Sequence, residues 1–69
     1  MKYAVVFERG PSSFGATVPD LPGCVAVAKT LDEARALIAE AIGFHIEGML
    51  LHGEKVPEPT TLAELVEVG

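Results

Sequence analysis

Two histidines and one cysteine are the side chains of this 69-residue sequence that most often bind metals, and their spacing limits what they can do together. His45 and His52 stand seven residues apart, which places them on one face of a helix with backbones roughly 10 Å apart. At that separation both imidazoles reach one zinc ion, at about 2 Å, only if the helix bends or other chains add ligands. The sequence has neither a CxxC nor an HExxH pattern. We therefore predict no metal and no cofactor.

Cys24 and the carboxylates are the remaining candidates for catalysis. A cysteine with histidines elsewhere in the chain is the minimum for a Cys–His pair, but Cys24 opens an apolar strand and has no neighbour that would lower its pKa. A carboxylate pair such as Glu8 with Asp20 is unexceptional in a chain with ten acidic residues. No glycine-rich phosphate loop is present. The sequence predicts a protein that is not an enzyme.

Acidic residues recur with a regular spacing in the second half of the chain. Glu33, Glu40, Glu47 and Glu54 are each seven residues apart, and seven residues are nearly two helical turns, so they form one row. Such a row is either a solvated helix face or an electrostatic docking surface for a basic protein. We take Glu33, Glu40 and Glu47, together with Asp20 in an exposed turn, as candidate partner-binding residues.

Three short apolar segments that precede this row read as strands. They cover residues 2–8, 14–18 and 24–29, and in the first two segments apolar side chains at every second position share one face. Glycine, proline and serine separate them, at Arg9–Ser13 and again at Pro19–Gly23. Because the links are short, we predict an antiparallel meander.

A helix is predicted from Leu31 to about His52, ended by Gly53. Thr30 and Glu33 fit a capping box, in which the threonine oxygen and the glutamate carboxylate accept from unpaired N–H groups at the helix start. One helical face collects the apolar positions and one histidine: Ala34, Ile38, Ala41, Ile42, His45 and Met49. Ile46 and Leu50 flank this face and make it wider than one sheet contact requires, so we take them as candidate self-association residues.

Residues 63–68 follow a proline-bearing link and are expected to form a short fourth strand, with a helical turn at Ala63–Leu65 as the alternative. The fold class is then α+β with the order β-β-β-α-β: a small, mostly antiparallel sheet with one helix on one face. The length allows one domain, residues 1–69.

Composition narrows the class of protein. Five basic and ten acidic residues give a formal net charge of −5, and the basic residues are scattered, so direct nucleic-acid binding is not expected. No apolar run suits a membrane span or a signal peptide, which favours the cytoplasm. A domain of this size buries only about 60% of its unfolded surface, and one cysteine allows no intrachain disulfide. Self-association or a partner is the expected compensation.

The run Pro19-Asp20-Leu21-Pro22-Gly23-Cys24, the helix start Thr30-Leu31-Asp32-Glu33-Ala34 and the link Val56-Pro57-Glu58-Pro59 together resemble the HicB-like antitoxin family over nearly the whole chain. The resemblance implies a partial RNase H-like fold of four strands and one helix. It also implies neutralisation of a small basic RNA-cleaving toxin of the HicA type, and homodimers or higher homo-oligomers. Many members carry a further DNA-binding segment, whereas this sequence stops at Gly69 and is similar to the short form, so DNA binding is not expected.

Two functional hypotheses follow. The first is an antitoxin-like protein that binds and neutralises a HicA-type toxin by protein–protein contact. The alternative is a stand-alone homo-oligomeric binding or regulatory domain without a toxin partner. The β-β-β-α order also occurs in double-stranded RNA-binding domains, but the scattered basic residues argue against that class.

Overall fold

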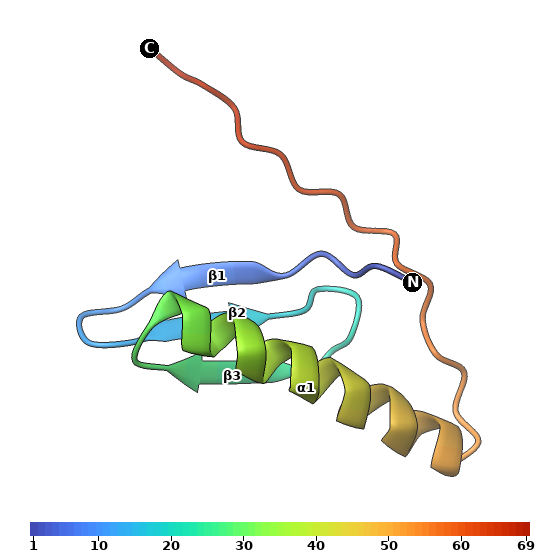
Figure 1. Cartoon of the computed structure of the whole chain (residues 1–69). Coiled ribbons are helices and arrows are strands. Elements are labelled where there is room, and N and C mark those ends of the chain that lie inside the picture. Colours follow the sequence, from blue (N-terminus) through green and yellow to red (C-terminus); the bar gives the residue numbers. More distant parts are fainter.

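The computed structural model describes all 69 residues and contains three strands followed by one helix (Figure 1). The strands are β1 (Val6–Arg9), β2 (Phe14–Thr17) and β3 (Val25–Ala28), and the helix is α1 (Leu31–Leu51). Neighbouring strands are antiparallel, and the order in the sheet is β1-β2-β3. The predicted α+β class, with an antiparallel meander and one helix on one face, is confirmed.

The first strand begins later than residue 2, where the sequence pattern places its start. Val6 pairs with Thr17, the last residue of β2. Directly after Thr17 the chain enters a turn, in which the Val18 N–H donates to the Cys24 carbonyl at 3.2 Å and the Cys24 N–H donates to the Leu21 carbonyl at 3.0 Å. Residues before Val6 therefore have no β2 partner, because a strand needs a neighbour as well as a suitable pattern.

The sheet has one side under the helix and one open side. Phe7, Ala16 and Ala26 are cross-strand partners in one row, and all three pack in the core beneath α1. The two neighbouring cross-strand rows face the open side of the sheet. One row consists of Val6, Thr17 and Val25, and the other consists of Glu8, Gly15 and Val27. Val25 and Val27 are 59% and 68% exposed, so the open side of β3 is apolar and uncovered.

The core is small and lies between α1 and the β2–β3 half of the sheet. Its buried cluster consists of Ala16, Val18, Leu21, Cys24 and Ile38. The predicted helical face is confirmed, because Ala34 and Ile38 are buried and the other four positions are half-buried. The helix packs on β3 and β2 and makes little contact with β1. Many large apolar side chains, among them Val25, Val27 and Phe44, thus remain exposed in the single chain.

The ends of α1 lie where the sequence predicts them, but only the threonine half of the predicted capping box is formed, since the Glu33 carboxylate accepts no hydrogen bond from the Thr30 N–H. The Thr30 hydroxyl oxygen accepts from the Glu33 N–H at 3.1 Å, so Thr30 is the N-cap. Asp32 and Glu33 in the first turn lie at the positive end of the helix dipole. At the other end Gly53 adopts φ +70, a left-handed conformation that glycine reaches without a steric penalty.

The predicted fourth strand at residues 63–68 is wrong for the single chain. No regular element follows α1, and the chain beyond Thr61 runs away from the sheet (Figure 1). Its apolar side chains are almost fully exposed: Leu62 90%, Leu65 104%, Val66 77% and Val68 87%. The alternating pattern is present, but no edge of the same chain lies beside it. We call residues 62–68 the C-terminal arm.

Candidate partner-docking surface

The side chains considered for metal binding and catalysis lie apart from one another. Cys24 is 3% exposed within the core, and burial raises the pKa of its thiol above the ordinary value. His52 follows the last turn of α1, where its Nδ1 lies 2.7 Å from the Gly48 carbonyl oxygen. His45 is half-buried and lies seven residues, or nearly two turns, earlier. No group of three His, Cys, Asp or Glu side chains is placed to hold a metal ion.

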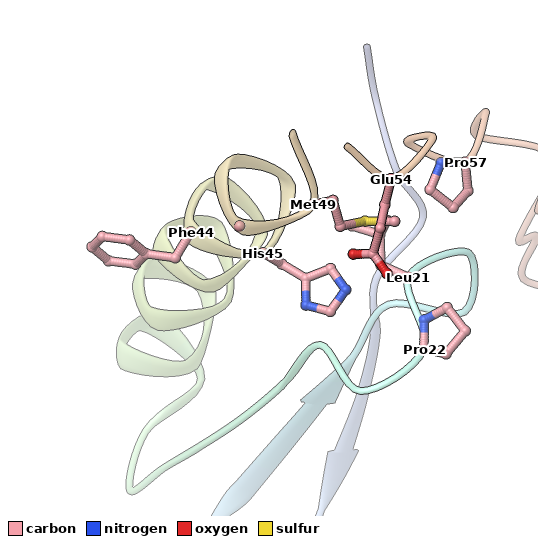
Figure 2. A pocket seen from close by; sticks show the side chains of 8 residues that line it. Leu21, Pro22, Phe44, His45, Met49, Glu54 and Pro57 are labelled. Atoms are coloured by element: carbon pink, nitrogen blue, oxygen red, sulfur yellow. The ribbon is translucent and has the colours of Figure 1, made fainter. Parts of the chain in front are cut away.

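His45 faces a surface hollow of about 440 Å³ between α1, the turn after β2 and the link after the helix. Figure 2 shows its imidazole directed toward Glu54 and Pro22, whereas Phe44 points away from them. The rest of the lining is apolar or backbone: Leu21, Gly48, Met49 and Pro57. One imidazole and one carboxylate over apolar walls can hydrogen-bond an inserted polar group.

The predicted acidic row is exposed on α1, since Glu33, Glu40 and Glu47 all lie at the surface. Beside it runs a second row that the sequence reasoning missed, formed by Leu37, Phe44 and Leu51 at 43%, 69% and 79% exposure. Each of these follows a glutamate by four residues, so each lies one turn along from a carboxylate. The signal was available in the sequence, because the apolar residues repeat every seven positions just as the glutamates do.

The mixed acidic and apolar rows continue onto the edge of the sheet. A groove of about 350 Å³ runs between α1 and β3, and it is lined by Val25, Ala26, Val27, Leu37, Glu40, Ala41 and Phe44. β3 is an edge strand, so backbone groups along its outer side are unpaired within the chain. We call Glu33, Leu37, Glu40, Phe44, Glu47 and Leu51, together with Val25 and Val27, the acidic–apolar surface.

Asp20 was predicted in an exposed turn, and the structure places it half-buried in a contact within the chain. Its Oδ2 accepts from the N–H groups of Thr60 and Thr61 at 3.0 and 2.9 Å, and its Oδ1 accepts from the two threonine hydroxyls at 3.2 and 2.7 Å. Donation from the Thr61 backbone and hydroxyl, followed by Thr60, lowers the pKa of Asp20 below its ordinary value. The Asp20 carboxylate holds the start of the C-terminal arm and is separate from the acidic–apolar surface.

Ile46 and Leu50, the predicted self-association residues, lie on the other flank of α1. Ile46 is half-buried and packs against the core, whereas Leu50 is 64% exposed. At 100° per residue, both lie on the opposite side of the core-facing Ile38 from Leu37 and Phe44. Since Leu37 and Phe44 border β3, Ile46 and Leu50 face the β1 side.

Comparison with known proteins assigns the chain to a family. The family model described as the HicB-like antitoxin of bacterial toxin–antitoxin systems matches residues 3–68. The chain therefore belongs to the HicB-like antitoxin family, as its sequence resemblance predicted, and this membership points to a toxin–antitoxin role and a toxin partner.

Similar proteins occur in a phage and in archaea. The chain is 38% identical over 66 residues to an uncharacterized 14.9 kDa protein of the rep-hol intergenic region of Haemophilus phage HP1. That match covers 96% of this chain and 50% of the phage protein, so the chain spans about half of that relative's length. A UPF0150 protein of Thermoplasma acidophilum is 41% identical over 58 residues, covering 83% of this chain and 84% of the relative. A UPF0150 protein of Archaeoglobus fulgidus is 42% identical over 48 residues, covering 68% and 70%.

The helix α1 lacks the combination of length and apolar character that crossing a bilayer requires.

Proposed function

We propose that this chain is an antitoxin that acts in the cytoplasm by binding a small basic RNA-cleaving toxin of the HicA type. The observation that carries the proposal is the acidic–apolar surface, in which three glutamates alternate with Leu37, Phe44 and Leu51 beside the open edge of β3. A surface of this kind contributes both to the affinity of a protein complex and to its rate of association. Apolar side chains supply affinity when they are desolvated, and the charged row steers the approach of an oppositely charged partner.

The negative charge of the surface also supports a mechanism of neutralisation, namely competition with RNA for the basic side chains of the toxin. A protein that cleaves RNA binds phosphates through Lys and Arg. α1 carries four acidic side chains and one arginine, and that arginine, Arg35, lies 3.0 Å from Asp32. Glu33, Glu40 and Glu47 can therefore engage the basic side chains that would otherwise contact RNA. We propose that the antitoxin competes with RNA for the same surface of the toxin.

The experiment is to test whether the neighbouring reading frame encodes a small basic protein, to co-express that protein with the chain and to measure association kinetics. Reversing Glu40 and Glu47 to lysine is expected to slow association by about tenfold or more at low salt, because steering is lost. The matched control is Glu8→Lys with Glu58→Lys, which changes the net charge equally at exposed sites outside α1. Phe44→Ser is expected to raise mainly the dissociation rate, because an apolar contact is removed.

The outcomes separate the hypotheses. Slower association in the control and not in the Glu40 and Glu47 variant would move the docking site away from α1. Failure of the wild type to bind the basic protein would instead favour a stand-alone homo-oligomeric binding or regulatory domain. The exposed apolar arm is the observation that favours this second function.

A further inference from the structure

The β3 edge of the sheet has none of the features that keep an exposed strand from pairing with another chain. Its residues, Val25–Ala28, are all valine or alanine, and neither a charged side chain nor a proline lies among them. Both valine side chains are exposed. The β1 edge differs, because Glu8 and Arg9 place two charges within it. β3 is therefore the edge of this sheet that another strand can join most readily.

The register of the sheet shows which backbone groups of β3 face outward. Val18 and Cys24 continue the register between β2 and β3, and the Val18 N–H donates to the Cys24 carbonyl at 3.2 Å. Directly opposite residues of an antiparallel pair alternate between hydrogen-bonded and non-hydrogen-bonded positions. Ala26 thus occupies a bonded position like Cys24, whereas the N–H and C=O groups of Val25 and Val27 point away from β2. The edge therefore offers a donor and an acceptor at each of the two valines.

A strand that pairs with Val25 and Val27 would place its alternate side chains in two different environments. The residues directly opposite the two valines would share their face, which is the open side of the sheet. The residue between them would face the helix, because α1 begins shortly after β3 ends and runs back along it (Figure 1). On that side Leu37, Ala41 and Phe44 line the groove of about 350 Å³. The groove thus suits one apolar side chain of an added strand.

The charge around the groove favours a basic occupant. Glu40 lines the groove, and Glu33 and Glu47 are exposed on α1 seven residues to either side of it. The one arginine of the helix, Arg35, is already paired with Asp32. A second copy of this chain would bring the same glutamates and a net charge of −5 to the edge, and like-charge repulsion disfavours that pairing. A segment with lysine or arginine would meet complementary charge instead.

We propose that the toxin partner adds an extended segment to this sheet as a strand beside β3, with an apolar side chain in the groove at Phe44 and a lysine or arginine two positions away, beside Glu40. Side chains two positions apart in a strand share one face, so both would lie against α1. Pairing with the β3 backbone supplies affinity, whereas the groove and the glutamate select the sequence of the segment. This inference rests on the proposed function and specifies how the toxin is held.

The first test is amide hydrogen exchange of the wild-type chain, alone and with the small basic protein of the neighbouring reading frame. In the complex, exchange at the outward N–H groups of Val25 and Val27 is expected to slow by about tenfold or more, because each gains a partner. Arg9 is the matched control. Its N–H faces outward on the β1 edge, since the next position is the bonded pair of Gly10 and Ser13, and its exchange is expected to stay unchanged.

The outcomes distinguish this inference from the proposed function. A complex that protects α1 and leaves the two valine amides exchanging freely would overturn strand addition, and the proposed function would stand. Absence of any complex would overturn both. Protection of the valine amides in the chain alone, increasing with its concentration, would assign the edge to a second copy and overturn the proposal.

The second test removes one outward donor. Val27→Pro keeps an apolar side chain, loses the outward N–H and breaks no hydrogen bond to β2. It is expected to weaken the complex by about tenfold or more, because the proline ring also occupies the place of the partner strand. Val27→Ala is the matched control: it removes more of the side chain, keeps the N–H and is expected to weaken the complex less. Equal affinities of the two variants, with folding checked by circular dichroism, would overturn strand addition. If the proline variant does not fold, the exchange measurement on the wild type decides.

Discussion

Asp20 shows how one side chain in this protein connects distant parts of the chain. It lies in the turn after β2, and it accepts four hydrogen bonds from residues that are 40 and 41 positions away. No local pattern predicts such a contact, since the threonines follow a proline-bearing link and Asp20 belongs to an ordinary turn. The sequence identified the residue as noteworthy and assigned it to a partner, whereas the structure gives it a role within the chain.

The pKa of Asp20 yields a prediction with a definite sign. Because hydrogen bonding lowers the pKa in the folded state, the carboxylate stabilises the fold above its ordinary pKa of 3.8, and this contribution is lost as the pH falls through the lower folded value. Asp20→Asn can accept through one oxygen only and is expected to melt at a lower temperature at neutral pH. The difference from the wild type is expected to shrink in acid below about pH 4.

Thermal melts of both proteins across this pH range measure the effect, with Glu58→Gln as an exposed control on the same link. A difference that persists undiminished at the acid end would mean that the ionised Asp20 carboxylate does not hold the arm.

The helix is the element that the sequence predicts best, because its signals are local. Thr30, Glu33 and Gly53 mark its ends within one turn of the residues they affect. The predicted strands overlap the observed ones but have inexact ends: each was predicted to start too early or to end too late, except that β1 continues one residue further than predicted, to Arg9. The ends depend on where a neighbouring strand stops, which the sequence pattern does not show. The fourth strand could not be located from its own alternation, because pairing depends on an edge that its chain does not bring to it.

Thr30→Ala tests the start of α1. Loss of the hydroxyl that accepts from the Glu33 N–H is expected to lower the free energy of unfolding by about 0.5–2 kcal/mol. Urea denaturation measures this as a lower midpoint at unchanged slope. Thr30→Ser keeps the acceptor and is the matched control. Equal midpoints for the alanine and serine variants would refute the capping role.

The sheet has two edge strands, β1 and β3, and the side chains that surround them differ. The β3 edge borders glutamates and exposed apolar side chains of α1, whereas the β1 edge borders the anchor of an apolar arm. The first of these, β3, is the edge that we propose for the toxin. Composition alone led to the expectation that so small a core needs a partner, and the structure shows which surfaces lack one.

Concentration dependence of melting is the prediction at this scale. If the predicted self-association covers the exposed apolar side chains of the C-terminal arm, mass action makes the melting temperature rise with protein concentration. The Leu65→Glu and Val66→Glu variant is expected to melt at a temperature that changes little with concentration. Differential scanning calorimetry at several protein concentrations measures this dependence. A flat wild-type curve would show that folding and association are not linked.

The buried cysteine has a practical consequence. Cys24 is the single thiol of the chain, lies in the core between the turn after β2 and α1, and is 3% exposed. A thiol-modifying reagent reaches it only when that core opens, and burial already disfavours the reactive thiolate. The modification rate under native conditions therefore records how often the centre of the domain opens. The rate of Cys24 modification can therefore be measured both for the single chain and for its complexes, without introducing another cysteine.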